Sequence, residues 1–276
     1  MSTRLFFLIL LCAATAHADP PAPFHRIYGS VRDDHGNPLA TGVGTIILSG
    51  TGNVEIVRST SDTEIAPGIN YSLSVPMDSG TSAQLYTVSA LRPMLPFTIR
   101  VVIANVSYVP IQMAGATWTI GDPSLSTRID LTLGVDSDND GLPDQWEYDL
   151  IDSDLSGMLQ SLADVNPNDD LDHDGLTNLQ EYIAGTYALD NGDGLFLNIL
   201  SVNNGLARLQ FLAITGRTYH IRASTGLGTY VLQPFSIVPS GQNPAPYYQP
   251  DDVRTVDAYV PTNGETKTFY NLGVQQ

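Results

Sequence analysis

The chain has little cysteine and few basic side chains, and each shortage excludes something. Cys12 is the single cysteine among 276 residues, so no disulfide can form within one chain. Only 12 Lys and Arg stand against 29 Asp and Glu, and the formal net charge is −17 at pH 7. A chain without a basic footprint is not expected to bind nucleic acid. Its 42% hydrophobic content is nevertheless enough for about two or three small domains with buried cores.

The first residues predict a secretory signal peptide. Arg4 is followed by an apolar run and then by the small-residue sequence Ala16-His17-Ala18. The run has about a dozen residues where a membrane span needs about 20, which disfavours an anchor. A lipid on Cys12 is also disfavoured, because the preceding residue is not small. We therefore expect residues 1–18 to be removed, and the mature chain to be secreted or held at the cell surface without a membrane span.

The acidic residues are concentrated in one segment. Residues 136–193 contain 16 of the 29 Asp and Glu, and no Lys or Arg lies between Arg128 and Arg208. Carboxylates packed this closely repel one another unless a positive charge lies between them. The segment has no basic side chain of its own, so either it is a solvated or disordered linker or it binds a cation.

Two stretches in this segment fit one twelve-residue template, "DSDNDGLPDQWE" from residue 136 and "DLDHDGLTNLQE" from residue 170. Both have Asp at positions 1, 3 and 5, Gly at 6, Asp or Asn at 9 and Glu at 12, as in an EF-hand calcium loop. Ligands that are all oxygen favour Ca²⁺ over transition metals. We therefore predict two Ca²⁺ sites. The ligands of the first are Asp136, Asp138, Asp140, Leu142 through its carbonyl, Asp144 and Glu147. Those of the second are Asp170, Asp172, Asp174, Leu176 through its carbonyl, Asn178 and Glu181.

The loops differ from a standard EF-hand pair. The first follows a strand pattern instead of a helix, and Pro143 at position 8 has no N–H for the backbone bridge between paired loops. His173, at position 4 of the second loop, is expected to be exposed and not to bind metal. Asp190–Gly194 ("DNGDG") lacks the later ligands and is interpreted as a turn. Asp164, Asn166 and Asn168, which precede the second loop, could add ligands to it, but we expect them to have capping and turn roles.

The sequence predicts β-structure on both sides of the acidic segment. Residues 24–133 contain the runs "HRIYGSV", "TIILSG", "YSLSVP", "FTIRVVIANV" and "IDLTL", separated by Gly, Pro, Asn and Asp. Residues 195–276 contain "LFLNILSV", "ARLQFLAI", "TYHIRAS" and a closing "GETKTFYNLGV". Between them, in residues 136–190, "LPDQWEYDLI" and "LTNLQEYIAG" predict short helices with an apolar face, which includes Leu179 in the second. The predicted fold is mainly β, with two β-sandwich-like domains joined by a short helical calcium-binding spacer.

The loop pattern D-x-D-x-D-G-L-x-D/N-x-x-E resembles bacterial thrombospondin type 3 repeats and, more distantly, dockerin loops. This resemblance covers only the two loops. It implies a secreted or surface-attached bacterial protein in which calcium stiffens the spacer between β domains. In addition, "IYGSVRDDHGNPLA", residues 27–40, resembles the opening of carboxypeptidase-regulatory-like β-sandwich modules.

The sequence carries no convincing catalytic motif. It has no G-x-S-x-G elbow, H-E-x-x-H, P-loop or Rossmann fingerprint, and the loops already explain the carboxylates that could serve a glycosidase. We therefore predict a structural or adhesive calcium-binding protein and no enzyme. An enzyme accessory protein or hydrolase has less support than the main alternative, which is a carbohydrate- or protein-binding module whose partner is a cell-surface polysaccharide or protein. For this module, Tyr247 and Tyr248 in "PAPYYQP" would offer rings to a sugar.

Overall fold

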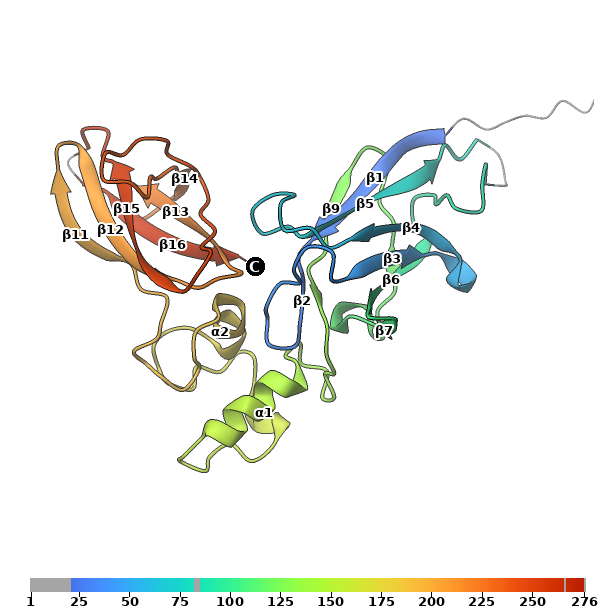
Figure 1. The fold of residues 1–276 in the computed structure, drawn as a ribbon, viewed down its shortest axis with the longest axis horizontal. Coiled ribbons are helices and arrows are strands. Elements are labelled where there is room, and N and C mark those ends of the chain that lie inside the picture. The colour runs from blue at the N-terminus through green and yellow to red at the C-terminus, as the bar shows by residue number, and fades with distance from the viewer. Residues whose placement is uncertain (1–20, 82–84, 266, 276) are drawn as a thin grey trace, which may run out of the picture.

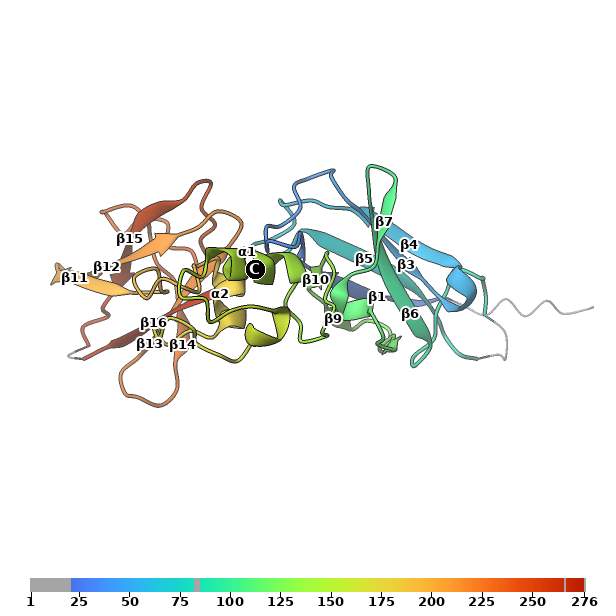
Figure 2. The same cartoon turned by 90° about the horizontal axis from the view of Figure 1, so that it is seen from below.

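The computed structural model describes residues 21–81, 85–265 and 267–275. The predicted signal peptide, its cleavage position near Ala18 and Cys12 therefore lie outside the described residues. The fold is mainly β, as predicted. Two β regions lie at opposite ends of the long axis, and the segment with both acidic loops lies between them (Figures 1 and 2).

The N-terminal β region has two main sheets. One has the order β5-β1-β9, and the other has the order β4-β3-β6-β7, with β8 also paired to β6. A short parallel pair, β2 with β10, extends toward the middle of the molecule. The elements are β1 (Pro21–Gly29), β2 (Val31–Arg32), β3 (Thr45–Ser49), η1 (Thr51–Asn53), β4 (Glu55–Thr60), β5 (Tyr71–Asp78), β6 (Pro96–Ile103), β7 (Val106–Tyr108), η2 (Ile111–Met113), β8 (Trp118–Thr119), β9 (Ser126–Arg128) and β10 (Leu131–Thr132).

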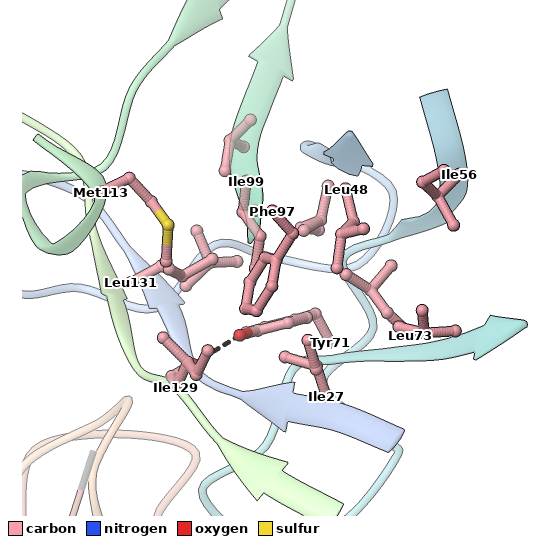
Figure 3. Packing of buried hydrophobic residues seen from close by; sticks show 14 of the residues in the cluster. Ile27, Leu48, Ile56, Tyr71, Leu73, Phe97, Ile99, Met113, Ile129 and Leu131 are labelled. Carbon is pink, nitrogen blue, oxygen red and sulfur yellow. Dashed lines mark hydrogen bonds between the residues drawn. The ribbon is translucent and has the colours of Figure 1, made fainter. Parts of the chain in front are cut away.

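Alternating side chains of the two main sheets form one core. Ile27 and Leu73 point from the β5-β1-β9 sheet toward Leu48 and Ile99 of the other sheet (Figure 3). Tyr71 lies among them with no exposed surface, and its hydroxyl donates a hydrogen bond of 2.5 Å to the Ile129 carbonyl. A phenol in a dry core needs such a partner, because an unpaired buried polar group is costly.

One expected strand proved to be two. "FTIRVVIANV" was predicted as a single strand, but β6 ends at Ile103 and pairs with β7 across a two-residue turn. The turn residues Ala104 and Asn105 have φ of 48° and 67°, the left-handed conformation that tight hairpin turns require. Asn105 was the signal for this turn in the sequence.

The C-terminal β region also has two sheets, of order β11-β12-β15 and β14-β13-β16. Its core is separate from the N-terminal one and includes Phe211 and Tyr219, whose ring centroids are 5.2 Å apart. The strands are β11 (Asn198–Asn203), β12 (Leu206–Ala213), β13 (Thr218–Ser224), β14 (Val231–Gln233), β15 (Arg254–Pro261) and β16 (Phe269–Gln275).

The middle segment carries α1 (Asp144–Ser153), η3 (Leu162–Asp164) and α2 (Asn178–Ala184). Leu142, Leu150 and Tyr182 pack in a small third core, as their spacing predicted. Leu179, expected on the apolar face of this segment, does not belong to it: the residue is 36% exposed and lines a cleft. Among the described residues, no helix is long and apolar enough to cross a membrane.

The buried Tyr71 hydroxyl gives a test of the N-terminal core. We expect Tyr71→Phe to lower the free energy of unfolding by about 1–2 kcal/mol, because the Ile129 carbonyl is left buried without its donor. Urea unfolding in buffer with Ca²⁺ measures this. Tyr108→Phe, at a side chain that is 39% exposed, is the matched control and should change stability little. Equal stability of both variants would contradict the assigned hydrogen bond.

Candidate metal centre

The two acidic loops have the same backbone conformation. The Gly at position 6 has φ of 100° in Gly141 and 101° in Gly175, and the residue at position 4 is left-handed in both. In each loop the backbone N–H at position 6 donates a hydrogen bond of 3.1 Å to the carboxylate at position 1, which belongs to Asp136 or Asp170. The loop is thus closed by its own first side chain, and only Gly takes the required φ at position 6 without strain.

In both loops the first three carboxylates converge. One oxygen from each of Asp136, Asp138 and Asp140 lies within 4.8 Å of the others, and Asp170, Asp172 and Asp174 form the same arrangement. These clusters could hold a metal ion. The exposed side chain of His173 matches the expectation that it stays outside the cluster.

The second loop contains buried oxygens that have no partner. Four oxygens of this loop lack a hydrogen-bond partner within the described part of the chain: Oδ2 of Asp172, Oδ2 of Asp174, Oδ1 of Asn178 and Oε2 of Glu181. Asn178 is fully buried and Glu181 is 1% exposed. The other oxygens of Asp172 and Asp174 accept backbone N–H groups, which fix the carboxylates in place. Unpaired buried acceptors are rare in folded proteins, so this set fits a cation that the four oxygens would share.

In the first loop, fewer of the predicted ligands have buried oxygens without a partner among the described residues. Both oxygens of Glu147 are buried and lack a partner in the described part of the chain, and the residue has no exposed surface. Asp144, however, accepts hydrogen bonds from the N–H and hydroxyl of Ser137 at 2.7 and 2.6 Å, one to each oxygen. The predicted ligand Asp144 therefore braces the loop, and the two loops differ at position 9.

Burial and mutual repulsion also shift the pKa values of the loop carboxylates. Burial, followed by repulsion from the loop aspartates, raises the pKa of Glu147 and of Glu181 to about 8. Burial, with Asp138, Asp136 and other neighbours adding to it, also raises the pKa of Asp140. A cation in the loop would reverse these shifts, because it would favour the ionised carboxylates.

The third acidic run is a turn, as predicted, and it packs against the second loop. The Asp193 N–H donates to the Asp190 carbonyl at 2.8 Å, and the Asn191 amide donates to the Asp172 carbonyl at 3.1 Å. A side chain at Gly194 would collide with the carboxylate of Asp174. No spacing rule in the sequence predicted this contact. Asp164 caps η3, which matches its expected role.

A third cluster of potential metal-binding side chains, Asp33-Asp34-His35, lies in the turn after β2. The Asp33 carboxylate accepts from the backbone N–H groups of His35 and Asn37. The His35 ring lies 3.0 Å from Asp34 and 3.3 Å from Asp149 of α1. These groups already have partners, so the cluster ties the N-terminal β region to the middle segment.

The C-terminal end of α2 is where all three parts of the molecule meet. From the C-terminal β region, the buried Arg217 side chain donates a hydrogen bond of 2.9 Å to the Ile183 carbonyl. From the N-terminal side, Gly36 lies so close that an added Cβ would be 3.2 Å from the Tyr182 ring and 3.1 Å from the Arg217 guanidinium. Glu181 of the second loop immediately precedes Tyr182. We call these contacts of Tyr182 and Ile183 with Arg217 and Gly36 the joint. The second loop and the joint therefore share one turn of α2.

Comparison with known proteins adds no relative: no family model, curated protein or solved structure matches the chain.

The raised glutamate pKa values predict how the metal-free protein responds to pH. Between about pH 4.5 and 8 the folded state binds more protons than the unfolded state, so stability should fall as pH rises through this range. We expect urea unfolding in EDTA to show a loss of about 1 kcal/mol or more from pH 5 to pH 8.

The double variant Glu147→Gln, Glu181→Gln is neutral at both positions and should lose most of this pH dependence. If wild-type and variant proteins have the same pH dependence, the two glutamates do not titrate as their burial requires.

Proposed function

We propose that the protein is a secreted or cell-surface structural protein in which two Ca²⁺ ions fix the spacer between two β regions. The observation that carries the proposal is the set of buried, unpartnered oxygens on Glu147, Asp172, Asp174, Asn178 and Glu181. These are hard oxygen ligands, and those of the second loop occupy positions 3, 5, 9 and 12 of the calcium-loop template. The repeated loop conformation supports two sites of one kind.

Oxygen donors in this order favour Ca²⁺ over smaller or softer ions. Ca²⁺ takes six to eight oxygens with tolerant geometry, and Glu at position 12 can bind it through both oxygens. In the first loop neither Glu147 oxygen has a partner among the residues that the structure describes, which suits this mode. The carbonyls of Leu142 and Leu176 would complete each set. Affinities in the extracellular range of about 10⁻⁴ to 10⁻³ M would suit an exported protein.

The proposed role of the metal is mechanical. Without it, the loop aspartates repel one another and the buried glutamates fold only if they take up protons, and α1 and α2 are too short to persist alone. With it, Glu181 holds the first turn of α2, and the same helix presents the carbonyls that Arg217 binds and the ring that packs on Gly36. Metal binding would thereby set how the two β regions are held.

The alternative of a sugar-binding module gains little from the geometry. The Tyr248 hydroxyl accepts hydrogen bonds from Arg254, and its backbone pairs with Tyr219. The Tyr247 ring packs against His220, with centroids 6.1 Å apart. Both tyrosines have contacts within the C-terminal β region, so the geometry supports this alternative less than it supports calcium binding.

Calcium stoichiometry tests the proposal. Isothermal titration calorimetry on residues 19–276 should give two Ca²⁺ per chain. Glu147→Gln and Glu181→Gln should each remove one site, because the amide loses the charge and the bidentate mode. Glu64→Gln, an exposed glutamate outside both loops, is the control and should keep two sites. No binding by the wild-type chain at millimolar Ca²⁺ would refute the proposal.

The mechanical role has a separate test. Small-angle scattering should show a longer particle in EDTA than in Ca²⁺, while β-sheet circular dichroism persists because both β regions have cores of their own. Arg217→Gln should lengthen the particle even in Ca²⁺ while both ions stay bound, since it breaks the joint and leaves the loops intact. The exposed Arg222→Gln is the control. Unchanged dimensions in EDTA would mean that calcium does not hold the joint.

A further inference from the structure

We propose that the cleft beside Arg32 is a binding site for a small organic monocarboxylate. The cleft has a volume of about 480 Å³ and lies where the three parts of the molecule meet. Its walls come from β2, β9 and β10, from the first acidic loop, from α2 and from the end of β16. The lining residues used below are Arg32, Arg128, Asp130, Leu179, Ile183 and Val274.

Arg32 is the reason to expect an anion. Arg32 is one of the residues that line the cleft, it is only 5% exposed, and its Nε and Nη2 have no hydrogen-bond partner among the described residues. Nε and Nη2 form one edge of the guanidinium, which is the edge that grips a carboxylate with two parallel hydrogen bonds. The other arginine this deeply buried, Arg217, donates to backbone carbonyls.

The charges around Arg32 leave it unneutralised. Burial lowers the pKa of Arg32 to about 10, so the side chain stays protonated at neutral pH. Asp130, a carboxylate that acts on the Arg32 charge, already accepts from Arg128 at 3.1 Å and from the Ser30 N–H at 2.8 Å. Removing a charge from water without a partner is strongly unfavourable. An anion that reached this edge would relieve that cost.

The remaining walls select the kind of anion. Leu179, Ile183 and Val274 give the cleft an apolar side, and this position accounts for a partly exposed leucine on α2. One guanidinium edge neutralises a single charge, while Asp130 and the acidic loop at Gly141 would repel a second one. A monocarboxylate with a short apolar body therefore fits better than phosphate or sulfate. Because the Arg32 donors are shielded from water, the ligand has to displace side chains of the cleft wall to reach them.

The test is titration of sodium hexanoate into the Ca²⁺-saturated full chain, followed by calorimetry or ligand-observed NMR. We expect saturable binding at one site, with hexanol and inorganic phosphate at least tenfold weaker. Arg32→Lys keeps the charge but loses the two-donor edge, and should weaken hexanoate at least tenfold. Arg222→Lys, an exposed arginine, is the matched control and should bind like wild type.

A second variant keeps the proposal testable if Arg32→Lys does not fold, as judged by its calcium stoichiometry. Leu179→Ser alters only a partly exposed cleft wall and should weaken hexanoate several-fold. No hexanoate binding at 20 mM (about the limit of a useful site), or equal binding by wild type and the folded Arg32 variant, would overturn the proposal. Calcium stoichiometry is measured separately, so this failure would leave the proposed function untouched.

Discussion

Glutamates buried among aspartates are the constraint on which the middle of this molecule depends. Glu147 and Glu181 have almost no exposed surface, and the loops around them contain several aspartates but no Lys or Arg. A folded protein can hold such groups in two ways: it can protonate them, which their raised pKa values reflect, or it can place a cation between them. A buried glutamate among aspartates would destabilise a loop without a cation, and the same carboxylates would hold a loop rigid around a bound cation.

This constraint reaches the β regions through a short path of contacts. Glu181 is followed directly by Tyr182, and the carbonyls of Tyr182 and Ile183 accept hydrogen bonds from Arg217. On the other side of α2, the Asp33–Asn37 turn packs against Tyr182 and reaches α1 through His35. The two β regions have separate cores, so their relative placement depends on this joint and not on a shared hydrophobic interior.

Local patterns predicted the local structure. The mainly β fold, the two short helices and the clustering of Asp136, Asp138 and Asp140 follow from spacings of two to twelve residues, which geometry converts directly into proximity. What the sequence did not reveal depends on contacts between distant segments. The packing of Asp190–Gly194 on the second loop, the Arg217 bond to α2 and the buried Arg32 all belong to this class. Even within one segment, the turn at Asn105 divides a run that was predicted as one strand into two strands.

Hydrogen–deuterium exchange with and without Ca²⁺ tests the central claim most directly. The amides of Gly141, Leu142, Gly175 and Leu176 donate to carboxylates within the loops. Ca²⁺ should slow exchange at least tenfold in residues 136–147 and 170–185, and also in the 215–217 turn, which contacts α2 but carries no predicted ligand. Exchange that Ca²⁺ leaves unchanged in the loops would contradict metal binding, and slowing confined to the loops would contradict the mechanical link to the β regions.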